Sequence, residues 1–194
     1  QPLRASMASP LHLGLDLGTT NVKALVIDER GQSRGEGACG IHLTPVGDGG
    51  AEQDLEEIWQ ATLTAIRAAL ATVDPRAVTA LGISSQGGAL QLLTADQQPL
   101  GRVISWLDQR GRHDDERLTA TLGRPWFRER IVHGRCALAP GQLLRLRRER
   151  PDWLTRPHRV GFVGDAIVGR LCGRAAHDAT SAGLTLLLNP RRGG

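Results

Sequence analysis

Residues 11–28 read LHLGLDLGTTNVKALVID, and this stretch decides how the rest of the chain is interpreted. An apolar run that contains Asp16 is followed by a tight polar turn and then by a second apolar run. Two short apolar runs bounded by turn residues predict the strands of a hairpin, at about 11–17 and 22–28. The turn consists of Gly18, Thr19, Thr20 and Asn21, and Lys23 follows at its exit.

The chemistry of this turn suits the phosphates of a nucleotide. A glycine lets the backbone approach a ligand closely and turn its N–H groups outward. The hydroxyl and amide groups add donors, and Lys23 adds a point charge. Asp16 is a hard oxygen ligand for Mg²⁺, an ion that keeps most of its waters and takes only one or two carboxylates. The residue types leave one alternative open, which is a surface hairpin with a polar tip.

Length and composition narrow the class of protein. The 194 residues are enough for one large domain or two small ones. No apolar run approaches membrane-spanning length, and no secretory signal pattern is present. The three cysteines are far apart and form neither a metal spacing nor a disulfide framework, so we expect a reducing cytoplasm. Residues 1–10 are expected to be a lead-in, disordered or vector-derived, with Met7 as a natural start.

The net charge of +4 and the pI of about 9.7 invite a nucleic-acid interpretation. Lys23 is the only lysine, however, and the excess of arginine, alanine and glycine indicates a G+C-rich coding sequence. The densest basic run, Arg145–Arg150, is interrupted by an acidic residue and by a helical apolar period, which predicts a solvated helix face. We therefore expect no nucleic-acid partner and no membrane partner.

The first half of the chain predicts a mixed sheet. A third strand at about 34–43 completes an antiparallel meander. It contains a literal G-x-G-x-x-G at 35–40, which we reject as a dinucleotide motif because that motif must open a helix. A helix is predicted over 54–73, with Asp54 as its N-cap. Val78–Ile83 then predicts a buried parallel strand, so helices should pack on a mixed sheet.

The second half is less regular. Ser84–Gly88 follow a predicted strand, and ligands gather at the carboxyl ends of such strands. The segment almost matches a G-x-S-x-G nucleophile elbow but lacks its last glycine and its helix. Strands are predicted at 89–93, 103–106 and 160–163. Helices are predicted from Asp108 to about 122, at 142–148 and at 165–171. Pro151 and Pro157 should bound a loop, and a polar small-residue segment covers 176–183.

This series of segments resembles the FGGY carbohydrate kinases, which share the actin, hexokinase and heat-shock-chaperone fold. The resemblance covers nearly everything from Leu11 to Asn189, and xylulokinase-like members look most similar. Five motifs carry it, in order: GLDLGTTNVK at 14–23, AEQD at 51–54, ALGISSQ at 80–86, ISWLDQR at 104–110 and DATSAGLT at 178–185. The resemblance implies an α/β, ribonuclease-H-like domain with a mixed sheet over residues 11–194.

The resemblance also implies roles. Asp16 would organise the Mg²⁺ of Mg·ATP, and the ATP phosphates would face Gly18, Thr19, Thr20, Asn21 and Lys23. The sugar would lie beside Gln86, Gly87, Gly88, Trp106, Asp108 and Arg110. The chain departs from the family at Gly87 and Gly88, where xylulokinases have Met-His and glycerol kinases Arg-Glu. It also departs near Ala139–Gln142, where a lysine and a tryptophan are usual. The two glycines are expected to leave room for a sugar larger than glycerol.

The resemblance places the general-base aspartate and the adenosine pocket in a second, C-terminal domain. No match to that domain is found here, so no catalytic residue is expected in this chain, and the fragment alone should be inactive. The expected function is ATP-dependent phosphorylation of a sugar or polyol, with a xylulose-like ketose as the first candidate. A homodimer is compatible with this expectation. The alternative is a non-catalytic ATP-binding regulator or a chaperone-like member of the same fold.

Overall fold

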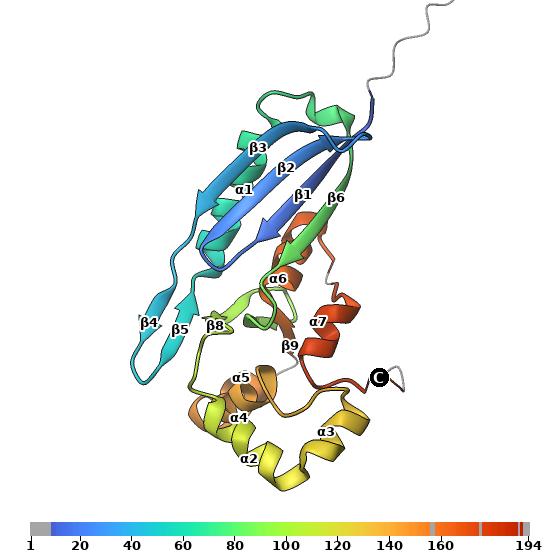
Figure 1. Ribbon diagram of the computed structural model, residues 1–194. Coiled ribbons are helices and arrows are strands. Elements are labelled where there is room, and N and C mark those ends of the chain that lie inside the picture. Colours follow the sequence, from blue (N-terminus) through green and yellow to red (C-terminus); the bar gives the residue numbers. More distant parts are fainter. Residues whose placement is uncertain (1–8, 156–157, 175, 190, 192–194) are drawn as a thin grey trace, which may run out of the picture. The chain divides into compact units, whose positions relative to one another are not determined.

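A computed structural model describes residues 9–155, 158–174, 176–189 and 191 of the chain (Figure 1). The chain forms two compact units. The first unit contains residues up to Ile41 together with Glu56–Ser85, and the second contains His42–Leu55 and the chain from Gln86 on. Most of the predicted lead-in (residues 1–8) and Pro157 lie outside the described residues.

The first unit is built on a four-stranded mixed sheet. Strands β1 (Leu11–Leu17), β2 (Asn21–Asp28) and β3 (Ser33–Gly40) form the predicted antiparallel meander. Strand β6 (Val78–Ser85) pairs parallel to β1, giving the order β3-β2-β1-β6. The third strand ends at Gly40, three residues earlier than predicted. The G-x-G-x-x-G segment lies within β3 and opens no helix, which confirms its rejection as a dinucleotide motif.

Helix α1 (Leu55–Leu70) runs along one face of this sheet (Figure 1). Every second side chain of a strand points to the same side of the sheet, so the alternating apolar residues of the strands form the face that packs against α1. The side chains buried there are Leu13, Leu15 and Leu17 of β1, Val22, Ala24 and Val26 of β2, and Ile58, Ala61, Thr62, Ala65 and Ala69 of α1. The helix ends three residues before the predicted boundary, and a 3₁₀ turn (Pro75–Ala77) leads into β6.

Glycines bring α1 unusually close to β3. A Cβ atom added to Gly37 would lie 2.1 Å from the carbonyl oxygen of Ala65, and one added to Gly35 would lie 2.0 Å from that of Ala69. The backbones of strand and helix therefore meet directly, with only small side chains, Ala68 and Thr72, beside the two glycines. The prediction of a buried β6 was wrong, because β6 is an edge strand and its residues are mostly exposed.

The second unit contains a separate five-stranded sheet, which the sequence did not predict. It consists of β4 (Thr44–Val46), β5 (Gly50–Gln53), β7 (Leu90–Thr94), β8 (Pro99–Ile104) and β9 (His158–Phe162), in the order β4-β5-β8-β7-β9. All its pairings are antiparallel. Its core is formed by Leu90, Leu92, Ile104, Ala139, Leu146 and Phe162.

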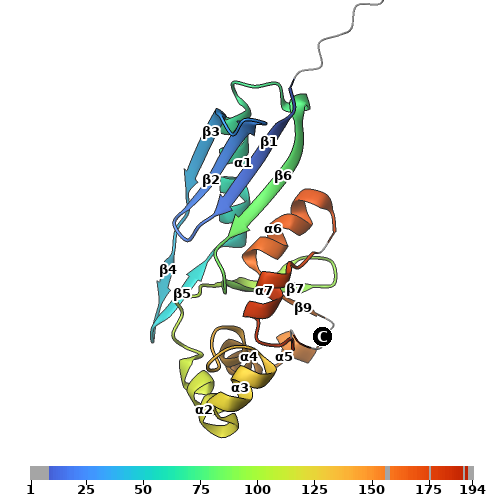
Figure 2. The same ribbon diagram turned by 45° about the vertical axis from the view of Figure 1, so that its right-hand side comes forward.

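Six helices of the second unit lie in the described residues: α2 (Arg112–Leu122), α3 (Arg124–Arg130), α4 (Ala139–Glu149), α5 (Asp152–Thr155), α6 (Val163–Cys172) and α7 (Ala179–Leu184). Helix α2 packs against both α3 and α4 (Figure 2). The predicted loop after Pro151 contains α5, and the predicted polar segment at 176–183 contains most of α7. Among the described residues, no helix combines the length and apolar character needed to cross a membrane.

Candidate functional site

The hairpin of the first unit places Asp16 and Lys23 directly opposite each other. They are register partners on β1 and β2, and both are exposed on the sheet face opposite α1. The parallel pairing with β6 sets Ser84 beside Asp16 on its other side. Side chains at paired positions share one face of a sheet. A cation, a carboxylate and a hydroxyl therefore form one row across three strands, and the hydroxyl was not anticipated from the sequence.

The turn between these strands is held tightly. The N–H of Gly18 donates to the carbonyl of Asn21 at 3.0 Å, and the N–H of Ile41 donates to the carbonyl of Thr20 at 2.9 Å. A Cβ atom on Gly18 would lie 2.9 Å from the carbonyl oxygen of Asn21, so the turn leaves no room for a side chain there. The amide of Asn21 donates to the Thr20 hydroxyl at 3.1 Å, and both side chains are exposed. Hydroxyl and amide groups thus stand at the tip beside the charged row.

This arrangement fits a nucleotide phosphate and its Mg²⁺. The described residues contain no group of three His, Cys, Asp or Glu side chains that could enclose a metal ion. A single exposed carboxylate is the donor set that suits Mg²⁺, since this ion keeps several waters and is completed by substrate phosphates. Asp16 could hold the ion directly or through water, and Lys23 could contact the phosphates. The hairpin therefore offers charge stabilisation.

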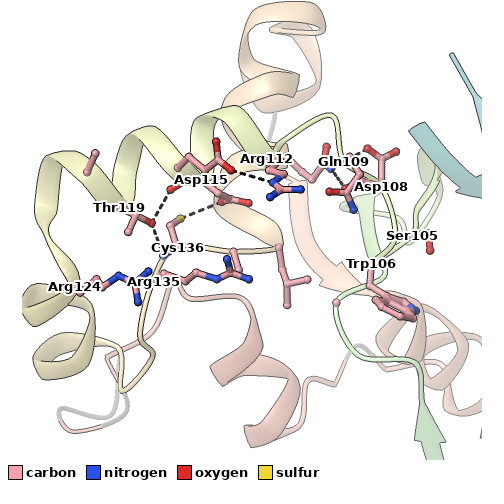
Figure 3. A pocket seen from close by; sticks show the side chains of 16 residues that line it. Ser105, Trp106, Asp108, Gln109, Arg112, Asp115, Thr119, Arg124, Arg135 and Cys136 are labelled. Atoms are coloured by element: carbon pink, nitrogen blue, oxygen red, sulfur yellow. Dashed lines mark hydrogen bonds and ion pairs between the residues drawn. The ribbon is translucent and has the colours of Figure 1, made fainter. Parts of the chain in front are cut away.

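A pocket of about 650 Å³ lies within the second unit, beside α2 (Figure 3). Three of the predicted sugar-site residues line it, namely Gly88, Trp106 and Asp108. Gln86, Gly87 and Arg110 are not among its lining residues. The other residues that line it are Ser105, Gln109, Arg112, Asp115, Glu116, Thr119, Ala120, Arg124, Arg135, Cys136, Ala137, Leu138 and Gln142.

Asp108 is the centre of a buried polar network under this pocket. Its Oδ2 accepts the N–H of Ala51 at 2.9 Å and Nη2 of Arg110 at 2.6 Å, while its Oδ1 accepts Nε2 of Gln142 at 3.0 Å. The same Nη2 also reaches Oε1 of Glu52 at 2.6 Å. Asp108 and Arg110 were predicted to begin a helix, but α2 begins only at Arg112, after a turn that this network holds.

The network determines the charge of Asp108. Burial acts to raise the pKa of this carboxyl, but the hydrogen bonds from Arg110 and the other donors outweigh it and leave the pKa lowered. The carboxylate is therefore ionised and fully supplied with donors. Gln142 supplies one of them. Asp108 is placed to hold the pocket wall in position.

The three residues that follow β6 lie close to other side chains of the second unit. Gln86 donates through Nε2 to Oε1 of Gln53 at 2.8 Å. A Cβ on Gly87 would lie 3.0 Å from Cδ1 of Leu184, and one on Gly88 would lie 3.0 Å from both methyl carbons of Leu138. A side chain at either position would therefore meet a leucine, and the expectation that the two glycines leave room for a sugar larger than glycerol stays a prediction.

Sequence reasoning missed a second carboxyl in the pocket, Asp115 of α2. Its Oδ1 accepts the N–H of Gly141 at 2.9 Å and the thiol of Cys136 at 3.1 Å. Burial raises the pKa of Asp115. Burial, together with the neighbouring Asp115 carboxylate, also raises the pKa of the Cys136 thiol well above its usual range. Cys136 is 21 positions and Gly141 is 26 positions from Asp115 in the sequence, and no local motif joins them to it.

Glycines also fix the crossing of α2 and α4. A Cβ on Gly141 would lie 2.3 Å from the carbonyl oxygen of Gly111, and one on Gly111 would lie 2.6 Å from the backbone nitrogen of Gln142. The start of α4 is thus pressed against the residue that precedes α2. This contact sets the positions of Asp115 and Gln142, and with them one side of the pocket.

Comparison with known proteins agrees with this architecture. The profile "FGGY family of carbohydrate kinases, N-terminal domain" matches residues 11–193. A xylulose kinase of Escherichia coli is 29% identical over 183 residues, which are 92% of this chain and 37% of that protein. A glycerol kinase of Dechloromonas aromatica is 31% identical over 190 residues, 93% of this chain and 38% of its own length.

Solved structures show the same fold. The crystal structure of a "xyloylose kinase" from Brucella ovis superposes with a TM-score of 0.84 at 30% identity, covering 92% of this chain and 38% of the other. The chain thus spans less than two-fifths of each of these relatives. The likeness confirms the predicted fold class, an α/β domain with a mixed sheet as in the sugar kinases.

Proposed function

Because the chain belongs to the FGGY family of carbohydrate kinases, we propose that the protein transfers the γ-phosphoryl group of ATP to a hydroxyl of an open-chain sugar or polyol. The observation that carries the proposal is the row of Lys23, Asp16 and Ser84 beside the Gly18 turn. Phosphoryl transfer depends mainly on positioning and on stabilisation of charge, and this row offers groups suited to both.

The residues divide the work between binding and charge stabilisation. Asp16 would hold Mg²⁺, which neutralises phosphate charge when bound. Thr19, Thr20, Asn21 and the N–H of Gly18 would orient the phosphates, and Lys23 would stabilise charge that develops during transfer. The general base, an aspartate by family resemblance, is proposed to come from a C-terminal domain beyond residues 11–193. Without that base, the isolated chain is proposed to bind its ligands but not to catalyse the transfer. The protein is also proposed to act in the cytoplasm.

We assign the sugar to the pocket of the second unit. Trp106 offers an apolar face, and Gly88 and Asp108 line the same hollow. Gln86 and Arg110 would act indirectly, since their polar groups hold Gln53, Asp108 and Glu52. Gly87 contributes close packing on Leu184. A ketose or a related polyol of five to seven carbons remains the first candidate, by resemblance to xylulokinase-like members.

The experiment that tests the function uses Asp16→Ala and Lys23→Ala in the complete enzyme. Each substitution should lower kcat by about a hundredfold or more, because the lost group acts on the charge of the transferred phosphoryl. The KM for the sugar should change less than threefold, since the sugar pocket is untouched. The control is Glu36→Ala, an exposed substitution on β3 of the same sheet, which should leave both constants unchanged. Unchanged turnover in both Asp16→Ala and Lys23→Ala would refute the proposal.

The alternative function is a non-catalytic ATP-binding regulator. It shares the hairpin but gives no role to the Trp106 pocket. A complete protein that binds Mg·ATP and phosphorylates none of glycerol, D-xylulose, D-ribulose, L-ribulose or gluconate would favour this alternative.

A further inference from the structure

Ser84 is the third member of the row that crosses the sheet of the first unit. The strand register sets it beside Asp16, which in turn lies opposite Lys23, and all three side chains are exposed. The row ends at these positions, because β6 is the edge strand of this sheet (Figure 1) and Ala38, the β3 partner of Lys23, has no polar side chain. Ser84 therefore gives the row a neutral group that can both donate and accept a hydrogen bond.

The protein itself leaves these polar groups accessible. Within the part of the chain that the structure describes, the hydroxyl of Ser84 forms no hydrogen bond, and Asp16 and Lys23 form no ion pair although they are register partners. The carboxylate and the hydroxyl are exposed on the same face of the sheet, on neighbouring strands. One ligand can therefore contact both of them.

The sheet face next to Asp16 and Ser84 is bare. Two positions earlier on the same face, β1 and β6 have Gly14 and Gly82, which are themselves register partners. A Cβ on Gly82 would meet no atom within 4 Å, and one on Gly14 would meet only a backbone oxygen at 3.9 Å. On β2 the corresponding position is Leu25, which is 41% exposed. The side of Asp16 toward β6 therefore has more open room than the side toward β2.

Charge favours the same side for a metal ion. An ammonium group repels a divalent cation and attracts phosphate, so Lys23 on β2 favours Mg²⁺ on the β6 side of Asp16. This ion keeps several waters when it binds to a protein. Neighbouring strands lie about 4.8 Å apart, and a side chain at that separation can reach a water of the hydration shell without itself replacing a ligand of the ion. Ser84 is the polar side chain at this place.

We infer that Ser84 is a positioning residue for the metal, whose hydroxyl accepts a hydrogen bond from a water of the Mg²⁺ hydration shell on the β6 side of Asp16. This inference rests on the proposed function, because it concerns the Mg²⁺ of the same nucleotide site. Ser84 contacts neither the sugar nor the transferred phosphoryl group in this assignment. Its contribution is to the binding of the ion, so it can be measured without turnover.

Calorimetric titration of the complete protein with AMP-PCP, an ATP analogue that cannot transfer its γ-phosphoryl group, tests the inference. The titration is made once with saturating Mg²⁺ and once with EDTA. Ser84→Ala should weaken binding about fivefold in Mg²⁺, the loss expected for one hydrogen bond. In EDTA the affinity should change less than about twofold, since the hydroxyl then has no partner. Ser84→Thr keeps the hydroxyl and should bind like the wild type in both media.

Ser85→Ala is the matched control. It removes the same group from the next residue of β6, and consecutive side chains of a strand point to opposite faces of the sheet. The register partner of Ser85 is Leu17, which is fully buried on the α1 side. This variant should bind AMP-PCP like the wild type with and without Mg²⁺. In an Asp16→Ala background, Ser84→Ala should cause no further loss, because both residues act on one ion.

The outcomes separate the inference from the proposed function. An unchanged affinity of Ser84→Ala in Mg²⁺ overturns the inference. So does an equal loss in EDTA, which would assign the hydroxyl to the phosphates, and so does an equal loss in Ser84→Thr or Ser85→Ala. Each of these results leaves the proposed function standing, since that is tested by the kcat of Asp16→Ala and Lys23→Ala. If Ser84 supports the ion but the complete protein phosphorylates no sugar, the proposed function fails while the role of Ser84 stands.

Discussion

At the scale of single residues, two aspartates seven positions apart show how the surroundings decide the charge of a carboxyl. Asp108 and Asp115 both line the pocket of the second unit, and Asp108 is buried while Asp115 is half-buried. Arg110 and three other donors surround Asp108, so its pKa is lowered in spite of burial. Asp115 accepts only an N–H and a weak thiol donor, so burial prevails and its pKa is raised.

The two carboxyls should therefore respond to pH with opposite sign. A lowered pKa adds stability that is present above the unfolded value of about 3.9 and is lost as the pH falls through the folded value. We expect Asp108→Asn to lose about 2 kcal/mol of unfolding free energy at pH 7, and this deficit should shrink below about pH 4. Urea unfolding followed by tryptophan fluorescence between pH 3 and 7 measures the effect.

Asp115→Asn should behave in the opposite way. A raised folded pKa stabilises the protein below the unfolded value and loses that contribution as the pH rises through the folded value. The asparagine keeps an acceptor for the N–H of Gly141 but carries no charge to bury. The variant should therefore gain stability relative to the wild type as the pH rises from about 4 to 7. A constant difference across this range would contradict the assignment of burial as the cause.

At the scale of elements, the two backbone contacts made by glycines determine where helices lie. Helix α1 rests on Gly35 and Gly37 of β3, and α4 crosses Gly111 at Gly141. Gly37→Ala should cost about 3 kcal/mol, because the new methyl group would lie 2.1 Å from a backbone oxygen that cannot move alone. Gly82→Ala is the control in the same sheet, since its Cβ would meet no atom within 4 Å. Thermal unfolding of both variants gives the comparison, and equal melting temperatures would show that α1 can shift freely.

Local patterns predicted the elements well where a repeat was present. The alternation of Leu13, Leu15 and Leu17 predicted β1 of the hairpin, and helical spacing predicted α1. The parallel strand β6 followed instead from a near-continuous apolar run. Periodicity could not show that the strands separate into two sheets, or that Val78–Ile83 runs along an edge, because an apolar run looks the same in both places. The contacts of the β3 glycines with α1 could not be predicted either, since a glycine in a strand indicates that another backbone approaches closely but not which one.

One part of the candidate site could be predicted from the sequence, and the other part could not. The hairpin residues are contiguous in sequence, so one motif contains them all and their type indicates the chemistry. The pocket combines the segments at 105–109, 112–124 and 135–142. Asp115, Cys136 and Arg135 belong to no motif, and only the crossing of α2 and α4 brings their segments together. Long-range placement of this kind depends on tertiary packing, which a single sequence does not display.

At the scale of the whole molecule, about half of the arginines that the structure describes form ion pairs with carboxylates. Arg34 binds Asp28, Arg110 binds Asp108 and Glu52, and Arg148 reaches Asp114 at 2.6 Å. The prediction of a solvated face for the run 145–150 was wrong for Arg145, which is 5% exposed and bonded to Glu149 at 2.6 Å. Arginines held by carboxylates contribute little to a surface that could follow a phosphate backbone.

We therefore expect no binding of nucleic acid at physiological salt, in spite of the pI of about 9.7. Binding that rests on a few unpaired arginines is lost as salt rises, because it gains only from the release of counter-ions. Fluorescence anisotropy with a labelled 20-base-pair duplex should give no signal at about 150 mM KCl. A dissociation constant near 1 μM that persists at this salt concentration would show a basic surface that the ion pairs do not neutralise.

The close fit of Gly88 and Leu138 has a consequence for how this protein can evolve. Gly88 has a φ of +77°, and Leu138, at +66°, places both its methyl groups where a side chain at position 88 would stand. A mutation at position 88 alone would meet the leucine as well as an unfavourable backbone conformation. A larger residue at position 88 therefore requires the methyl groups of Leu138 to move by a few tenths of an ångström, or a smaller side chain at position 138. Positions 88 and 138 of this pocket wall are thus expected to change together, and the backbone at position 88 disfavours any side chain whichever of the two changes first.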